Sequence, residues 1–122
     1  MLNLDTHILI HALAGSLRPA ERRLLSSHDW SLSAIVRWEL CKLARLGRVE
    51  IDLADAEVSR VLNRIHPWPL DWDVCRASCN LDVEGDPADQ LIGATSVVHD
   101  VPLVTRDRRL LRSRQVPLAG GP

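Results

Sequence analysis

Four short segments of this 122-residue chain place an acidic side chain where the local pattern predicts a strand end, a helix start or buried core. They are Leu2–Thr6, Val36–Leu40, Asp86–Ile92 and Leu103–Asp107, and their acids are Asp5, Glu39, Asp86, Asp89 and Asp107. Buried carboxylates repel one another and lose hydration, so a small domain tolerates such a cluster mainly when cations fill it. Because Mg²⁺ and Mn²⁺ bind clustered oxygen ligands, the pattern predicts a Mg²⁺ (or Mn²⁺) site.

The length of the chain indicates one domain, spanning residues 1–122, that can bury a core without disulfide or metal staples. No apolar run is long enough to span a membrane, and no basic segment followed by an apolar one opens the chain. We therefore expect a cytoplasmic protein without membrane association. Cys41, Cys75 and Cys79 fit no CxxC pattern, and we expect small buried thiols in a reducing compartment.

Short apolar runs alternate with helical patterns along the whole chain. We expect strands at 2–4, 30–33, 102–105 and 116–118 and an extended segment at 66–70. We expect helices at 5–13, 20–27, 34–46, 71–81, 86–99 and 108–112, and one from Asp52 or Asp55 to Arg64. This order predicts an α/β three-layer sandwich with a central, mostly parallel sheet of about four or five strands. Ligands gather at the carboxyl ends of such strands, where Asp5 and Asp107 fall.

Each acid also has a purely structural explanation. Asp5 and Asp107 are well placed as helix N-caps. Asp86 before Pro87 is another good cap, and Asp89 three residues later nearly completes a capping box. Glu39 is the hardest to explain, because at about 100° per residue it falls inside an apolar helix face with Val36 and Leu40. A charge there is costly unless it is paired with a core Arg, reaches the edge of the face or binds metal.

The same segments resemble a known family. Leu4–His7, Ser33–Leu40, Asp86–Thr95 and Pro102–Asp107 resemble the motifs of PIN-domain ribonucleases, most closely the VapC-like toxins of bacterial toxin–antitoxin pairs. All four motifs occur in the order of the family, and the resemblance covers essentially the whole chain. The sequence departs from the family pattern at Gln90, where Arg is frequent, and at Gly93, where Ala is common.

The resemblance implies the roles of the site residues. It makes Asp5, Glu39, Asp89 and Asp107 the catalytic, metal-binding carboxylates. Asp86 matches an acid common in the toxin subgroup, and it is either a further ligand or only a helix cap. Thr6 and Thr105 match hydroxyls that orient the acids. The implied activity is endonucleolytic hydrolysis of RNA by a water that Mg²⁺ or Mn²⁺ activates.

The resemblance also implies partners. These are an RNA substrate, a cognate small antitoxin and a second copy of the chain in a homodimer. The antitoxin would lie along a groove on this fold, and exposed leucines near the N-terminus are candidates for it: Leu9, Leu13, Leu17 and Leu24.

Arginines crowd the segment after Asp107. Arg106, Arg108, Arg109, Arg112 and Arg114 are candidates for contacts with RNA phosphates, unless they form only a solvated helix face. Trp68 and Trp72 are candidates for base stacking, although core packing or a dimer contact explains them better. His7 and His11 lie four residues apart, but without a third ligand type nearby we expect no zinc site.

Three other functions compete with the toxin ribonuclease. The first is a DNA nuclease or RNA-processing enzyme on the same scaffold, although the chain has no room for an additional nucleic-acid domain. The second is a Mg²⁺-binding signalling domain of the receiver type, which needs a late Lys, whereas the single Lys of this chain is Lys42. The third is a PIN scaffold that binds without cutting, which the complete set of acids disfavours.

Overall fold

Every strand of the central sheet runs in the same direction. The computed structural model describes residues 1–120 and contains β1 (Leu2–Leu4), β2 (Trp30–Ser33), β3 (His66–Trp68) and β4 (Leu103–Val104). The strands pair in the order β3-β2-β1-β4, and all three pairings are parallel. The expected α/β fold with a parallel sheet between helices is therefore confirmed.

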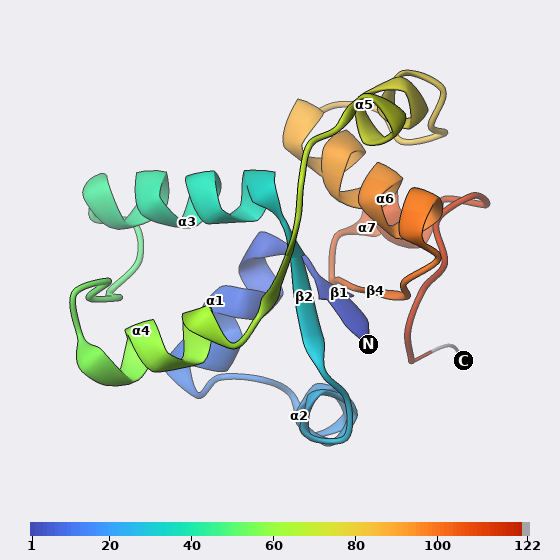
Figure 1. Ribbon diagram of the computed structural model, residues 1–122. Coiled ribbons are helices and arrows are strands. Elements are labelled where there is room, and N and C mark those ends of the chain that lie inside the picture. The colour runs from blue at the N-terminus through green and yellow to red at the C-terminus, as the bar shows by residue number, and fades with distance from the viewer. Residues whose placement is uncertain (121–122) are drawn as a thin grey trace.

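The helices cover both faces of this sheet (Figure 1). Their bounds are α1 Thr6–Ala14, α2 Pro19–Ser26, α3 Ala34–Arg45, α4 Ala56–Asn63, α5 Trp72–Cys79, α6 Pro87–His99 and α7 Arg108–Leu111. Because parallel crossovers are right-handed, the β1-to-β3 connections place α1, α3 and α4 on one face, and the return to β4 places α5 and α6 on the other. None of the helices among residues 1–120 is long and apolar enough to cross a bilayer.

The strand order reverses between β1 and β4. The chain leaving β1 enters α1, whereas the chain leaving β4 enters α7, whose Leu110 lies close to Gly93 of α6 on the opposite face (Figure 1). Two neighbouring strands whose connections separate in this way open a crevice at their carboxyl ends, which is where open α/β sheets bind ligands. Asp5 and Asp107 stand at this crevice.

Side-chain caps start most of the helices where the sequence predicts them. Six side chains accept hydrogen bonds from backbone N–H groups in the first turn of the helix that follows each of them. They are Asp5, Ser33, Asp55, Asp71, Asp86 and Asp107. The helix expected from Asp52 or Asp55 therefore begins after Asp55. Gly15 ends α1 with a positive φ of 71°, a conformation that costs a residue without a Cβ little.

Two expectations about the periphery are wrong. The strand expected at 116–118 is reduced to one parallel bridge between Leu103 and Leu118, because β4 has only two residues and Pro117 has no N–H to donate. The three cysteines are free, as expected, but Cys41 and Cys79 are exposed and Cys75 is only half-buried.

The core lies on both sides of β1. Leu4, Ile8 and Leu9 are fully buried, as are Ile92 and Leu103 on the other elements that pack around this strand. Leu9 is therefore not an exposed leucine, although it lines a cavity of about 360 Å³ together with Leu40 and Leu62. The leucines at 13, 17 and 24 are partly buried against the same core.

Asn3 ties the central strand to α6. Its side chain is fully buried, and its Nδ2 donates to the Ser96 hydroxyl at 2.9 Å and to the Ile92 carbonyl at 3.3 Å. Asn3 lies two residues before Asp5, and Ile92 lies three residues after Asp89. This buried contact therefore fixes the strand end that carries one acid against the helix that carries another.

We expect Asn3→Ala to lower the free energy of unfolding by about 1–3 kcal/mol, because it leaves buried acceptors on α6 unsatisfied. Ser96→Ala is the matched control, since it keeps the bond to the Ile92 carbonyl, and it is expected to cost less. Urea denaturation of the three proteins measures both effects. An Asn3→Ala protein as stable as the wild type would contradict this role.

Candidate active site

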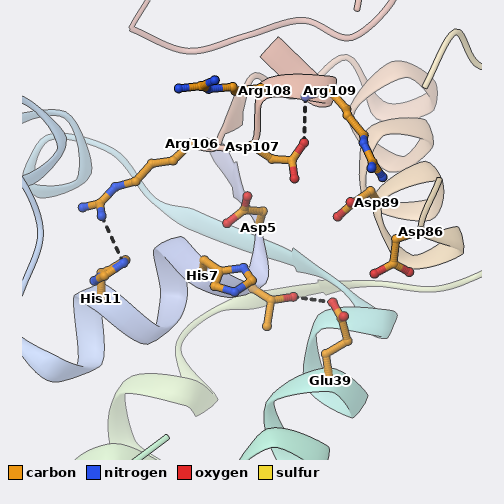
Figure 2. A pocket seen from close by; sticks show the side chains of 11 residues that line it. Asp5, His7, His11, Glu39, Asp86, Asp89, Arg106, Asp107, Arg108 and Arg109 are labelled. Atoms are coloured by element: carbon orange, nitrogen blue, oxygen red, sulfur yellow. Dashed lines mark hydrogen bonds between the residues drawn. The ribbon is translucent and has the colours of Figure 1, made fainter. Parts of the chain in front are cut away.

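A pocket of about 600 Å³ opens at the carboxyl edge of the sheet (Figure 2). Five carboxylates line it together with basic side chains: the lining residues are Asp5, Thr6, His7, His11, Glu39, Asp86, Asp89, Arg106, Asp107, Arg108 and Arg109. The fold thus brings together all the acids that the sequence singles out. Their assignment as catalytic residues or metal ligands remains a prediction.

The five acids come from four separate segments of the chain. Asp5 follows β1 and Asp107 precedes α7, while Asp86 and Asp89 belong to the start of α6. Glu39 extends from the second turn of α3 toward the same space (Figure 2). It is half-buried at the pocket wall, and Val36 and Leu40 of the apolar face expected around it are buried.

Capping and facing the pocket are not alternatives for three of these acids. Asp5 Oδ1 accepts from the Ile8 N–H at 2.9 Å, and Asp86 Oδ1 accepts from the Ala88 N–H at 2.9 Å. Asp107 Oδ1 accepts from the N–H groups of Arg109 and Leu110, at 2.9 and 3.2 Å. In each case one carboxylate oxygen holds the helix start while the side chain also lines the pocket.

Two threonine hydroxyls orient the acids. Thr6 Oγ1 donates to Glu39 Oε1 at 2.5 Å, which joins α1 to α3 at the wall of the pocket. Thr105 Oγ1 donates to Asp5 Oδ2 and accepts from the Asp107 N–H at 3.0 Å. The Thr105 hydroxyl therefore links the two acids at the ends of β1 and β4.

The crowding of the acids shifts their protonation equilibria. Desolvation, reinforced by the charges of Asp107, Asp86, Glu39 and Asp5, raises the pKa of Asp89 from 3.8 to about 6. Burial also raises the pKa of Asp5, against the opposing effect of its hydrogen bond from Thr105. The three ion pairs found within residues 1–120 include none of the five pocket acids, so no side chain neutralises this charge by direct pairing.

The pocket suits a divalent cation in its donor chemistry. Its acids supply the oxygen ligands that Mg²⁺ and Mn²⁺ prefer. The carboxylate of Asp89 accepts no hydrogen bond from the described residues, and neither does Oδ2 of Asp107. As placed, however, no three His, Cys, Asp or Glu side chains among residues 1–120 converge closely enough to hold an ion. Coordination would therefore require these carboxylates to rotate toward one another.

The arginines around the pocket are not equivalent. Arg108 and Arg109 line it, while Arg112 lies instead beside Leu81, Asp82 and Glu84. Arg106 also lines the pocket, but its guanidinium is bound to Glu21 at 2.6 and 2.8 Å. Nothing local in the sequence indicates this contact, because Glu21 lies 85 residues away and reads only as part of a helix start.

The two candidate tryptophans also differ in their surroundings. Trp68 stacks on His99, with ring centroids 4.0 Å apart, and packs edge-on against His66. Trp72 is 78% exposed at the start of α5. Packing against two histidines thus accounts for Trp68, which is half-buried outside the core, whereas Trp72 is exposed.

Comparisons with known proteins agree with this architecture. The family model described as "PIN domain" matches residues 3–115, and the chain therefore belongs to the PIN domain family. No curated protein matches the sequence.

Several solved structures share the fold. A toxin–antitoxin complex from Klebsiella pneumoniae aligns with a TM-score of 0.70 and 22% identity, over 92% of this chain and 91% of that one. VapBC2 from Rickettsia felis, in a structure bound to a DNA fragment from its promoter, aligns with a TM-score of 0.70 and 18% identity, over 97% of both chains. FitAcB from Neisseria gonorrhoeae aligns with a TM-score of 0.66 and 25% identity, over 97% of this chain and 96% of that one.

The raised pKa of Asp89 predicts a pH dependence of stability. The unfolded carboxyl ionises near 3.8 and the folded one near 6, so the folded state binds the proton more tightly. The ionised side chain therefore destabilises the metal-free protein increasingly from about pH 4 to pH 7. Because Asp89 is half-exposed and screened by solvent, we expect an effect of about 1 kcal/mol rather than the full shift.

Asp89→Asn removes this titration. Relative to the wild type, the variant should gain about 1 kcal/mol of unfolding free energy as the pH rises from 4 to 7, measured in EDTA by urea denaturation. Asp29→Asn, which changes an exposed acid outside the pocket, should show no such gain. A stability difference between Asp89→Asn and the wild type that does not change with pH would contradict the crowding of these charges.

Proposed function

We propose that this protein is a metal-dependent endoribonuclease that acts in the cytoplasm as the toxin of a toxin–antitoxin pair. In this proposal residues 1–122 form one PIN domain. The observation that carries it is the convergence of five carboxylates on one pocket at the reversal point of a PIN fold. The similarity to solved toxin–antitoxin complexes supports the biological role.

The proposed chemistry divides among the acids by their environment. Asp5, Glu39, Asp89 and Asp107 would hold Mg²⁺ or Mn²⁺, and Asp86 would add a ligand from the exposed rim. A cation bound there supplies positive charge that lowers the pKa of a bound water and offsets the charge of the phosphodiester. Thr6 and Thr105 hold Glu39 and Asp5 in place, and a bound cation would offset the desolvation and repulsion that raise the pKa of Asp89 in the metal-free protein.

Arg108 and Arg109 are the best candidates for contacts with RNA phosphates. Both are exposed at the rim of the acidic pocket, on the first turn of α7. Arginine at such a rim would position the RNA backbone without reading its sequence. Arg112 would contact only RNA that extends past the pocket toward Asp82.

We also propose two protein partners. A cognate antitoxin is supported by the structural neighbours, which are toxin–antitoxin complexes. The leucines at 13, 17 and 24 remain candidates for its groove because they are only partly buried. Leu9 is not an exposed candidate, because its side chain is fully buried. A homodimer would cover large apolar side chains that the chain exposes, including Trp38 and Trp72, which are 58% and 78% exposed.

The reaction is tested with purified protein, total bacterial RNA and Mg²⁺ or Mn²⁺, with cleavage sites read from new 5′-phosphate ends. We expect discrete cuts that EDTA abolishes. Asp5→Asn and Asp89→Asn should each lower the cleavage rate at least about 100-fold, because each removes a charged ligand that no neighbour replaces. Asp29→Asn is the matched control and should cleave like the wild type.

The outcomes separate the competing functions. Cleavage of DNA but not RNA would replace this proposal by a DNA nuclease. Cleavage that survives both pocket substitutions would refute the site. Metal binding without cleavage of any nucleic acid would favour a PIN scaffold that only binds.

A further inference from the structure

A half-buried ion pair fastens the end of β4 to α1 and α2 from outside the acid cluster. Arg106 donates from Nε to Glu21 Oε2 at 2.8 Å and from Nη2 to Glu21 Oε1 at 2.6 Å. Its Nη1 lies 3.0 Å from His11 Nε2, and His11 Nδ1 lies 2.7 Å from the Ser16 hydroxyl. The three nitrogens of the guanidinium are therefore all engaged by the protein itself.

The geometry argues against Arg106 as a phosphate ligand. The side chains of Arg106 and Glu21 are only 23% and 14% exposed, and their contact is bidentate. Swinging Arg106 toward an RNA phosphate would leave the Glu21 carboxylate poorly solvated and unpaired, which is costly. The hydrogen bonds from Arg106 also lower the pKa of Glu21 to about 2, so the pair stays charged at physiological pH.

Arg106 stands between the two residues that organise the acids. Thr105 donates to Asp5, and Asp107 caps α7 and lines the pocket. The Arg106 side chain is bound to Glu21 on α2, whereas the Thr105 side chain donates in the other direction, to Asp5 in the pocket. Opposed contacts on consecutive residues leave the backbone of 105–107 little freedom to move.

We propose that Glu21 and His11, acting through Arg106, are positioning residues that fix the backbone of residues 105–107, from which Thr105 and Asp107 serve metal binding and catalysis in the acidic pocket. This inference rests on the proposed nuclease function. It makes α2, which contributes no acid to the pocket, part of the support of the active site.

Arg106 could either position the acids or bind an RNA phosphate, and the two roles predict different effects of Glu21→Gln on kcat. If Arg106 positions the acids, loss of the Glu21 charge loosens residues 105–107 and lowers kcat. Misplacement of reacting groups by about 1 Å can cost up to about 100-fold, and we expect about 10-fold here, with KM for RNA changed less than twofold. If Arg106 instead grips phosphate, Glu21→Gln releases it and KM stays equal or falls.

The experiment compares Glu21→Gln, Arg106→Ala, Arg106→Lys, His11→Ala and the double variant Glu21→Gln/Arg106→Ala. The matched control is Arg22→Ala, an exposed residue next to Glu21 on α2 and outside the pocket. Steady-state cleavage of an RNA substrate identified with the wild type gives kcat and KM. Calorimetric titration with Mn²⁺ alone gives the affinity of the pocket, and amide hydrogen exchange at Asp107 reports the order of the loop.

We expect Glu21→Gln and Arg106→Ala to lower kcat and Mn²⁺ affinity alike, and the double variant to be no worse than either. His11→Ala should have a smaller effect, and Arg106→Lys, which keeps the charge but loses the bidentate contact, should recover part of the loss. Arg22→Ala should match the wild type. Wild-type kcat and Mn²⁺ affinity in Glu21→Gln, or a rise in KM confined to the Arg106 variants, would overturn the positioning role.

Failure of the proposed function gives a different result. A wild-type protein that cuts no RNA would refute the nuclease proposal. The positioning role would then be judged by two other measurements. Glu21→Gln should weaken Mn²⁺ binding and lower the protection of the Asp107 amide from exchange, whereas Arg22→Ala should change neither. Equal values in all of these proteins would overturn it.

Discussion

The mutual repulsion of five carboxylates in one crevice is the constraint on which the rest of this structure depends. Three of them, Asp5, Asp86 and Asp107, are the N-caps of α1, α6 and α7, so three helix starts face the same pocket. The N-terminal end of a helix carries partial positive charge, which offsets part of the repulsion. Desolvation, together with the repulsion that remains, raises the pKa of Asp89.

The same arrangement explains why capping and metal binding coexist. A carboxylate has two oxygens, and a cap occupies one of them. Placing the cap at the carboxyl end of β1 or β4 puts the side chain at the crevice between those strands. There the second oxygen of Asp5 accepts from Thr105, while that of Asp107 accepts no hydrogen bond from the described residues. The topology of the sheet, rather than any single motif, thereby converts ordinary helix caps into a candidate metal site. Substitutions that loosen β1 or β4 are therefore expected to affect the site as well as the fold.

Local signals in the sequence predict much of this fold. Asp5, Asp86 and Asp107 are recognised as caps because they precede helical patterns, and the buried strands are recognised by short apolar runs. The convergence of Glu39 with the other acids follows from its place on a helix that starts at a strand end. These features depend on neighbours in the sequence or on the parallel order of the strands.

Features that depend on distant partners escape prediction. Glu21 and Arg106 have no local pattern that pairs them, so the sequence presents Arg106 as one more candidate for RNA phosphates. Leu9 looks like an exposed position on an N-terminal helix but is fully buried against the sheet. Apolar residues also predict more strand at 116–118 than a two-residue neighbour can pair.

The most direct test of the central claim is a crystal structure of the protein soaked in Mn²⁺, with anomalous diffraction data that locate the metal. The account predicts an anomalous peak within the acidic pocket, coordinated by oxygens of Asp5 and Asp89 and at least one further carboxylate of the cluster. A peak elsewhere, or a pocket without metal at saturating Mn²⁺, would contradict it.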